Sequence, residues 1–346
     1  MTKSIRGCRK MKAAVFYGPR DIRVEEVEKP KVEAGEILIK VRACGICGSD
    51  LHTYKLGIFR ELGVPIGDDR LILGHEYSGD VAEVGEGVDG VRVGDRVTAV
   101  SMGGMAEYVK TFAFLNGNLF HLPPEVGYEE AATNEPLATS LHAANLASPA
   151  EGETILIAGA GIIGLGILQV LKARHNNKVM VADISNKRRD MAKQLGADDV
   201  IDPTTVDLSE QVTQLVGTWP MMFSPGQTTS ALDIAMDCVG TTVGSTRIPV
   251  IAQLLGIVRE NAKVVLVGTH EDKVTLDLNV IMGKGLRVLG SVAYGPDELA
   301  ESLEMMRSGK VNRKPLISHE FSLNEAKEAF ETQLMAHKAI KVLLKP

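Results

Sequence analysis

The segment Cys44-Gly-Ile-Cys47-Gly-Ser-Asp50-Leu-His52 contains side chains suited to redox or metal chemistry. Its two thiols could form a zinc knuckle or a redox pair. A structural zinc site normally needs a second pair of cysteines, and Cys8 and Cys238 form no such pair. The alternative is a catalytic metal site, in which three protein ligands from distant positions leave one coordination position open.

Two other segments offer ligands for such a metal. Gly74-His75-Glu76 supplies an imidazole and a carboxylate, and Asn134-Glu135-Pro136 supplies a further carboxylate. Composition and spacing alone cannot join these segments into one site.

A glycine-rich segment, Gly159-Ala-Gly161-Ile162-Ile163-Gly164, is typical of dinucleotide binding. It follows a predicted strand, Thr154–Ala158, and begins a predicted helix, Ile162–Lys172. Its glycines permit a tight turn and let a pyrophosphate approach the backbone and the helix N-terminus. Alone the pattern is weak, and a tight turn without a ligand is the alternative.

Asp183 adds the second part of this nucleotide signal. It follows the predicted strand Val179–Ala182 and lies 24 residues after Gly159, close to the spacing at which a carboxylate meets the adenosine ribose. A carboxylate there accepts hydrogen bonds from the ribose hydroxyls and repels a 2′-phosphate, which favours NAD over NADP. The cations of residues 187–189 (Lys187, Arg188 and Arg189) argue the other way, because they could receive a 2′-phosphate.

Two different patterns of elements must position these segments. The first 150 residues resemble short antiparallel strands between Gly-rich turns, and from about residue 151 strands alternate with helices, which predicts a parallel sheet covered on both faces. We therefore expect an α/β protein with a β-rich domain, residues 1–150 completed by 296–346, and a doubly wound domain, residues 151–295. The individual elements that we expect are strands at Lys12–Tyr17, Ile37–Val41, Asp80–Val84, Ala231–Ala235, Lys263–Val267 and Lys338–Leu344, helices at Asn186–Leu195 and Pro296–Ser308, and an exposed loop at Thr218–Gly226.

Composition excludes several classes of function. The 346 residues exceed what one compact core usually supports, and the formal net charge of −6 gives no electrostatic footprint for nucleic acid or an anionic membrane. No apolar run approaches the roughly 20 residues that span a bilayer, and the N-terminus lacks the apolar core of a signal peptide. Four cysteines in so long a chain make no disulfide framework, so we expect a cytoplasmic protein.

The motifs together resemble the zinc-dependent medium-chain dehydrogenase family. Gly74-His75-Glu76-Tyr-Ser-Gly79 looks like its zinc alcohol dehydrogenase signature, and Gly45–Asp50, Gly94–Val97, Glu135–Leu137 and the nucleotide segment occur in the family's order. The resemblance extends over nearly the whole chain. It implies a GroES-like catalytic domain, a Rossmann domain, one catalytic zinc, NAD, a small alcohol substrate and assembly as a homodimer or homotetramer.

The resemblance assigns the metal ligands residue by residue. Cys47 and His75 match the family's zinc ligands. Glu76 matches the adjacent carboxylate, which ligates the metal in some members and backs it in others. Glu135 matches the third-ligand position of the polyol and threonine dehydrogenase branch. Cys44 is interpreted as a small packed residue.

The resemblance also implies how protons and cofactor are handled. Zinc would act as a Lewis acid on the alcohol oxygen while a hydride passes to the nicotinamide. Ser49 and His52 match a proton relay that runs through the nicotinamide ribose, although His52 could also be a surface histidine. Arg188 matches a basic residue beside the adenosine ribose. The remaining expected cofactor contacts are Val267, Gly268, Thr269, Ser291, Val292 and Ala293.

Two departures from the family pattern bear on metal and substrate. Only Thr98–Gly104 separates Val97 from Met105–Val109, so the four-cysteine lobe that binds a second, structural zinc is missing. The segment Gly290-Ser-Val-Ala-Tyr294 lacks the Arg of sorbitol- and threonine-type enzymes and looks more like butanediol-type enzymes. We therefore expect a small, uncharged secondary alcohol or vicinal diol as substrate, with L-threonine and sorbitol both poor.

Alternatives remain open at this stage. Within the same branch, the chain could be an L-threonine 3-dehydrogenase or a sugar-alcohol (phosphate) dehydrogenase. A zinc-free relative would reduce quinones or enones with NADPH. A non-catalytic dinucleotide-binding protein is the alternative from another class.

Overall fold

The computed structural model describes residues 10–113, 117–222 and 225–346, and it divides the chain into two compact units. The first contains the chain up to Pro136 together with Leu299–Pro346, and the second is Leu137–Glu298. Helices α3 (Asn134–Ala147) and α9 (Pro296–Arg307) contain the two boundaries. None of the helices in the described ranges combines the length and the hydropathy needed to cross a membrane.

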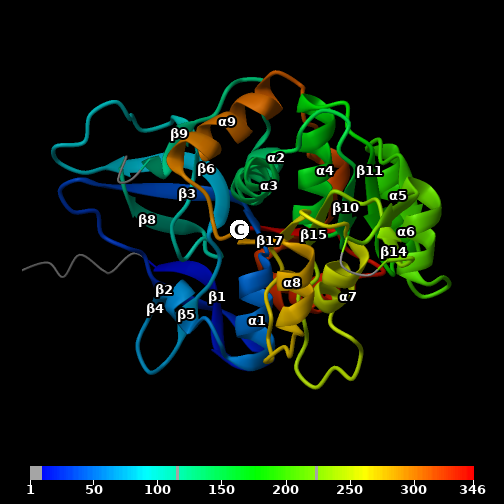
Figure 1. Cartoon of the computed structure of the whole chain (residues 1–346). Helices are drawn as coiled ribbons and strands as arrows, with labels where there is room; N and C mark the ends of the chain where they lie inside the picture. Colours follow the sequence, from blue (N-terminus) through cyan, green and yellow to red (C-terminus); the bar gives the residue numbers. More distant parts are fainter. Residues whose placement is uncertain (1–9, 114–116, 223–224) are drawn as a thin grey trace, which may run out of the picture. The chain divides into compact units, whose positions relative to one another are not determined.

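The first unit is built mainly from antiparallel strands, and Figure 1 shows β3, β6 and β8 running side by side within it. Its described strands form a four-stranded sheet in the order β2-β1-β5-β4 and a seven-stranded sheet in the order β18-β19-β3-β6-β7-β9, with β8 paired to β3. The strands are β1 (Lys10–Gly18), β2 (Asp21–Glu28), β3 (Glu36–Gly45), β4 (Val64–Pro65), β5 (Leu71–Ile72), β6 (Glu76–Val84), β7 (Arg96–Ala99), β8 (Tyr108–Phe112), β9 (Leu119–His121), β18 (Ile317–Ser322) and β19 (Lys341–Lys345).

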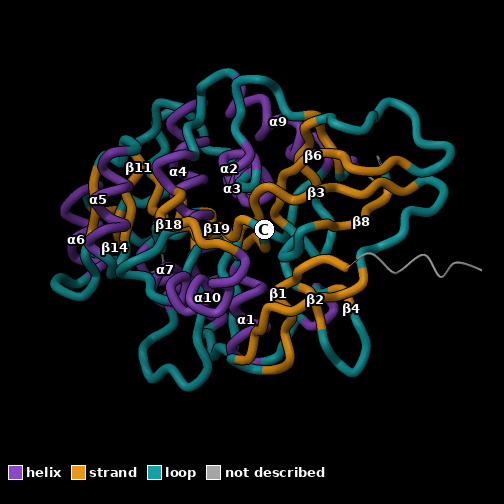
Figure 2. Tube along the Cα trace, turned by 180° about the vertical axis from the view of Figure 1, so that it is seen from behind, coloured by secondary structure: helices purple, strands orange, loops and turns teal. Residues whose placement is uncertain are grey.

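Strand β3 is central because it pairs with three other strands, β6, β8 and β19. Ile37, Ile39 and Val41 alternate along the strand and join the main apolar core, each at most 1% exposed. The end of the chain returns to this strand: β19 pairs antiparallel with β3 and parallel with β18, and Figure 2 shows β18 beside β19. The helices of this unit are α1 (Gly48–Leu56), α2 (Tyr128–Ala131) and α10 (Ala326–Leu334), with 3₁₀ turns at Arg60–Leu62, Lys314–Leu316 and Leu323–Glu325.

The second unit contains a six-stranded parallel sheet in the order β12-β11-β10-β15-β16-β17. From β10 the chain adds β11 and β12 on one side of the sheet and then β15, β16 and β17 on the other side. This is the doubly wound arrangement. Its elements are β10 (Ile155–Ala158), α4 (Ile162–Arg174), β11 (Val179–Ala182), α5 (Asn186–Gln194), β12 (Asp199–Ile201), α6 (Leu208–Val216), β13 (Thr218–Pro220), β14 (Thr228–Ser230), β15 (Ile234–Asp237), α7 (Val250–Ile257), β16 (Lys263–Leu266), α8 (Leu278–Lys284) and β17 (Arg287–Gly290).

Helices cover the parallel sheet because its strands are apolar on both faces. Leu156 and Ala158 of β10 join a core with the buried side chains of α6 and α7, whereas Ile157 lies under Gly164 of α4. The predicted α/β architecture, a β-rich part plus a doubly wound parallel sheet, is confirmed.

Two local predictions were wrong. The segment Thr218–Gly226 is not simply an exposed loop, because Thr218–Pro220 forms strand β13 and pairs with β14. The Arg259 guanidinium lies over the Trp219 ring, 5.0 Å from its centroid, and this contact holds the hairpin against the rest of the second unit. The predicted strand Ala231–Ala235 begins only at Ile234, because the apolar run includes the turn that leaves the hairpin.

Candidate metal centre and dinucleotide site

Asp50 fixes the two loops that carry the predicted metal ligands. Its carboxylate accepts hydrogen bonds from the Cys47 amide at 2.9 Å and the Gly74 amide at 3.2 Å. Asp50 is 1% exposed, and burial raises the pKa of its carboxyl, against the effect of His75 and of both amides. One buried side chain therefore holds Cys47, at the start of α1, close to the residue before His75.

Gly74 is required where it stands. Its φ of +91° is in the left-handed region, and a Cβ there would lie 2.7 Å from the Met105 side chain and 2.8 Å from Cys44 Sγ. Cys44 itself is completely buried in the main core, and burial raises the pKa of its thiol well above the ordinary value. It packs beneath the ligand loop and is not part of the group of potential metal ligands.

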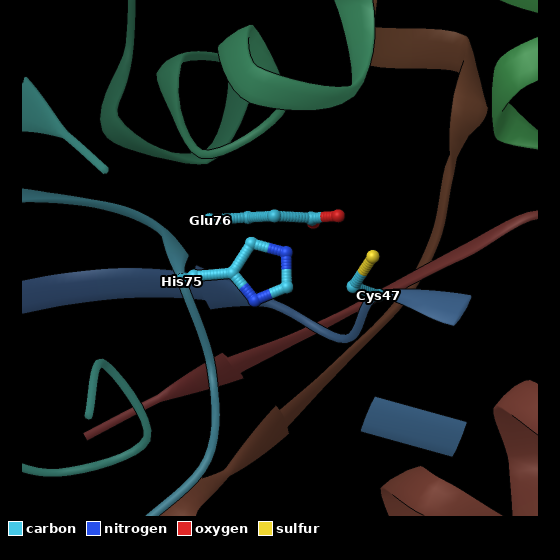
Figure 3. Close-up of side chains that lie close together, drawn as sticks. All are labelled: Cys47, His75 and Glu76. Atoms are coloured by element: carbon cyan, nitrogen blue, oxygen red, sulfur yellow. The ribbon is translucent and has the colours of Figure 1, made fainter. Parts of the chain in front are cut away.

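Cys47, His75 and Glu76 form that group. One ligand atom from each lies within 4.8 Å of the other two, and Figure 3 shows the three side chains pointing toward one another. His75 and Glu76 are 7% and 1% exposed. A thiolate sulfur, an imidazole nitrogen and a carboxylate oxygen are the donor types that bind a zinc ion with one position left open. The residues present therefore fit the metal.

The electrostatics of this group are those of mutually interacting buried ligands. Burial raises the pKa of the Cys47 thiol, and the carboxylate of Glu76 acts in the same direction. Burial lowers the pKa of His75, but Cys47, Asp50 and Glu135 outweigh it and hold that pKa well above its ordinary value. A divalent cation at this point would favour the thiolate and the neutral imidazole that coordinate it.

Glu76 also has a buried partner that no sequence pattern predicts. The ammonium of Lys341 on β19 forms an ion pair with it, and Lys341 is 0% exposed. Lys341 Nζ also donates a hydrogen bond to the Ile46 carbonyl at 2.8 Å. A Cβ on Gly45 would collide with both Glu76 and Lys341, so a larger residue there would displace the ion pair. No local pattern reveals Lys341, because 265 residues separate it from Glu76.

A second buried cation lies in the same region. Arg313 is 0% exposed, its amide donates to Glu130 Oε1 at 3.3 Å, and its Nε donates to Thr133 Oγ1 at 3.4 Å. Burial lowers the pKa of Arg313 to about 9, and Glu76 and Glu130 counteract the shift. The buried cations Lys341 and Arg313 thus compensate the buried carboxylates Glu76 and Glu130.

Glu135 stands apart from the three ligands. It occupies the first turn of α3, is partly buried, and is not part of the group within 4.8 Å. Its charge nevertheless raises the pKa of both Cys47 and His75, so it acts on the same region. Its role as a third ligand stays a prediction.

Helix α1 positions the predicted relay residues. Ser49 and His52 are three positions apart and therefore lie on neighbouring parts of one helical face. Ser49 Oγ is buried without a hydrogen-bond partner among the described residues, which suits a hydroxyl that would bond a substrate. The His52 ring lies edge-on to the Phe59 ring, with 5.8 Å between the centroids.

The glycines of the nucleotide segment are dictated by geometry. Gly159 has φ +100°, and a Cβ on it would lie 2.9 Å from Val239 Cγ2. A Cβ on Gly164 would collide with the Gly159 carbonyl, so α4 could not pack on β10. Gly161 is the N-cap of α4, and Ile162 and Ile163 form its first turn. The amides at this helix N-terminus are suited to a pyrophosphate.

Asp183 follows β11 and contacts this turn directly. Its two carboxylate oxygens accept hydrogen bonds from the amides of Ala160 and Ser185, both at 2.7 Å. Arg189 donates a hydrogen bond from Nη1 to the Asp183 carbonyl at 2.7 Å and forms an ion pair with Asp202 at 2.7 Å. Nη1 of Arg188 lies 3.9 Å from the position of a Cβ on Gly161, and burial lowers the pKa of its guanidinium. Asp183 and Arg188 thus both border the glycine-rich turn.

The remaining predicted cofactor residues lie at the same edge of the sheet. Parallel strands end at one edge, and ligands of doubly wound sheets bind there. The amides of Val267 and Gly268, after β16, donate to the Asp237 carbonyl at 2.9 and 2.8 Å. After β17, Ser291 Oγ is buried without a hydrogen-bond partner among the described residues. The other residues at this edge are Thr269, Val292, which is 82% exposed, and Ala293, with φ +50°.

Comparison with family models assigns both parts of the chain. Residues 33–122 match the alcohol dehydrogenase GroES-like domain, and residues 163–308 match the zinc-binding dehydrogenase domain. The first range contains Cys47 and His75, and the second begins at the end of the glycine-rich segment and contains Asp183.

Individual proteins resemble the chain over almost its full length. It is 30% identical to the (R,R)-butanediol dehydrogenase of Bacillus subtilis, covering 97% of this chain and 100% of that protein, and 31% identical to a sorbitol dehydrogenase of Halalkalibacterium halodurans, covering 97% and 99%. The crystal structure of the Bacillus subtilis 2R,3R-butanediol dehydrogenase superposes with a TM-score of 0.82, covering 97% of this chain and 99% of that one. A dehydrogenase from Escherichia coli CFT073, solved with NADH, is 26% identical, with a TM-score of 0.80 and coverage of 97% and 99%. The chain belongs to the zinc-dependent medium-chain dehydrogenase family, in its polyol and butanediol branch.

Proposed function

We propose that the chain catalyses the reversible, NAD-linked oxidation of a small secondary alcohol or vicinal diol to a ketone. The observation that carries this proposal is the convergence of Cys47, His75 and Glu76 within 4.8 Å, in a chain that also has the glycine-rich turn. The similarity to butanediol and sorbitol dehydrogenases supports a substrate with neighbouring hydroxyl groups.

Cys47 and His75 would hold the zinc ion together with a carboxylate, from Glu76 or from Glu135. When bound, zinc supplies a Lewis acid for the alcohol oxygen and NAD supplies the hydride acceptor. Asp50 keeps the loops of Cys47 and His75 at a fixed separation through its two hydrogen bonds.

The chain's own residues would move the proton of the alcohol. Ser49 would accept the hydroxyl proton at Oγ as it releases its own hydroxyl proton toward His52. Its Oγ is buried and has no hydrogen-bond partner among the described residues, and both residues belong to α1. His52 then delivers the proton to solvent. In this arrangement Ser49 is the group nearest the substrate, and His52 is the residue that releases the proton to solvent.

The second unit would bind NAD in preference to NADP. Gly159, Gly161 and Gly164 shape the turn for the pyrophosphate, and Asp183 presents a carboxylate at its side. The ion pair of Arg189 with Asp202 removes one of the cations that could receive a 2′-phosphate. Arg188 would lie beside the adenosine ribose.

Substrate choice follows from a missing cation. The segment Gly290–Tyr294 contains no Arg to bind a carboxylate or to order a long polyol chain. A site that lacks such a buried polar group discriminates less against analogues, so it should accept a wider range of small alcohols. L-Threonine and sorbitol would both be poor substrates.

The test is a panel of kcat/KM values for 2-butanol, 2,3-butanediol, sorbitol, a sugar phosphate and L-threonine, with zinc content measured on the same protein. We expect about one zinc per chain and the highest value for an uncharged small alcohol. A lead of about tenfold for threonine or sorbitol would overturn the substrate argument. Reduction of quinones or enones by zinc-free protein would identify a zinc-free reductase. Absence of any turnover would indicate a non-catalytic dinucleotide-binding protein.

We also propose that residues 1–150 with 296–346 form the catalytic domain and residues 151–295 the NAD-binding domain. The GroES-like match, 33–122, lies within the first of these domains, and the zinc-binding dehydrogenase match begins at 163, within the second, and extends to 308. A cytoplasmic homodimer or homotetramer is proposed on the family's properties and on the low cysteine content. Light scattering on the purified chain measures the oligomeric state.

A further inference from the structure

Phe59 has a backbone conformation that bulky residues rarely adopt. Its φ is +58° and its ψ is 32°, in the left-handed region. Such a conformation is unfavourable for a residue with a side chain, and it persists only where the surrounding structure imposes it. It occurs two residues after Gly57, which ends α1 with φ +71°. These two residues turn the chain back toward the helix that carries Ser49 and His52.

A single buried hydroxyl fastens this turn to the helix. Thr53, which is 1% exposed, has its Oγ1 3.0 Å from the Ser49 carbonyl and 3.4 Å from the Phe59 carbonyl. The Phe59 carbonyl also accepts the Leu62 amide at 3.0 Å. The backbone of Phe59 is thus tied to the helical turn of Ser49.

The result is a ring contact between Phe59 and His52. The centroids are 5.8 Å apart and the ring planes are inclined at 72°, an edge-to-face arrangement. Both side chains are partly buried. A phenyl ring in this position removes space into which the imidazole could otherwise rotate.

We propose that Phe59 is a positioning residue for the proton relay, because its ring restricts the orientation of the His52 imidazole that releases the proton. The proposal rests on the proposed function, since the relay operates only if an alcohol is oxidised. It accounts for the strained backbone: the left-handed conformation directs the ring back against His52, and Thr53 maintains it.

The first experiment separates turnover from binding. Phe59→Leu should lower kcat about tenfold, a part of the 10²- to 10⁴-fold that a positioned acid–base group contributes, with KM within about twofold. Phe59→Tyr keeps the ring and should restore kcat. Thr53→Val removes the hydroxyl and should lower kcat less. The matched control is Phe112→Leu, on β8 and 50% exposed, which should change neither constant.

The second experiment asks whether Phe59 acts through His52. In a His52→Gln background, Phe59→Leu should have no further effect on kcat. An equal loss in both backgrounds would show that the ring acts elsewhere, for example on substrate binding, and would overturn the proposal.

A spectroscopic measurement keeps the proposal independent of turnover. The imidazole signals of His52, assigned by their loss in His52→Gln, should shift in ¹H–¹³C NMR spectra of Phe59→Leu and return in Phe59→Tyr. Unchanged His52 signals in Phe59→Leu would refute the positioning role. Absence of alcohol oxidation in the wild type would refute the proposed function, while these signals would still decide whether Phe59 orients His52.

Discussion

Glu76, a candidate metal ligand, forms a buried ion pair with Lys341. Both are essentially unexposed, so the carboxylate has no access to bulk water and depends on the ammonium for compensation. Burial lowers the pKa of Lys341, but Glu76 and Cys47 more than compensate, and the pKa lies above its ordinary value. The amine is therefore charged when it meets the carboxylate.

Replacing Lys341 should destabilise the protein strongly. Lys341→Met leaves Glu76 buried without its partner, and removing one member of a buried pair typically costs about 3–5 kcal/mol. The measurement is the free energy of unfolding from urea titration. Lys345→Met, on the same strand, is the control: its ammonium is 41% exposed and pairs with Glu129 and Glu320, so at most about 1 kcal/mol is expected. Equal losses for the two variants would mean that Glu76 does not depend on Lys341.

At the scale of elements, the turn between β10 and α4 and the end of β11 act together. Asp183 bonds the amide of Ala160 in that turn, so one carboxylate both braces the loop and presents negative charge beside it. Its contribution to cofactor choice is electrostatic, whereas its contribution to loop geometry requires two acceptor oxygens, one for the Ala160 amide and one for the Ser185 amide.

Asp183→Asn removes the charge that repels a 2′-phosphate. Its amide oxygen can still accept one of the two backbone hydrogen bonds, whereas its NH2 group cannot accept the other. We expect the wild type to prefer NAD by at least about tenfold, or roughly 1.4 kcal/mol, in kcat/KM, and the variant to lose most of that preference. Asp190→Asn, on the exposed side of α5, should leave the ratio unchanged. A wild type without a preference would show that Lys187 and Arg188 dominate.

At the scale of the whole molecule, the two ligand sites belong to different compact units. The group Cys47, His75 and Glu76 lies in the first unit, and the glycine-rich turn and Asp183 lie in Leu137–Glu298. Trp219 is the chain's one tryptophan and belongs to the second unit, where it contacts Arg259. Its fluorescence therefore reports unfolding of the unit that would bind NAD.

Each ligand should stabilise the unit that binds it. NAD⁺ at 100 times its Kd should raise the free energy of the transition seen by Trp219 by about 2.7 kcal/mol. Removing zinc with a chelator should change the transition seen by Trp219 fluorescence only slightly. It should change more strongly the transition seen by far-ultraviolet circular dichroism, to which the first unit contributes. A Trp219 transition that responds to zinc alone would contradict the assignment of NAD to this unit.

Much of the architecture was accessible from the sequence because it depends on local patterns. Alternating apolar residues in Ile37–Val41 predict a strand, and the continuous apolar segments at Thr154–Ala158 and Val179–Ala182 predict buried parallel strands. Glycines that must adopt a left-handed φ or admit a close contact, such as Gly159 and Gly164, identify the dinucleotide turn before any coordinates exist.

The hairpin β13–β14 was not accessible in this way. Pro220, Pro225 and Gly226 are typical of a loop, and the pairing that makes Thr218–Pro220 a strand comes from Thr228–Ser230, farther along the chain. Trp219 is fixed by Arg259, which lies in another part of the chain. Composition describes a segment alone, whereas strand pairing depends on its partner.

The sequence by itself determined the chemical types: a thiol, an imidazole and carboxylates for a metal, and a glycine-rich turn followed by Asp183 for a dinucleotide. Only the tertiary structure decided which carboxylate lies with Cys47 and His75, and which cation faces it. Glu76 joins the group and pairs with Lys341 because β19 returns to β3 at the end of the chain. Such a contact joins residues far apart in sequence, and no local periodicity encodes it. The orientation of His52 against Phe59 was equally hidden, because it arises from a left-handed backbone that bulky residues rarely adopt.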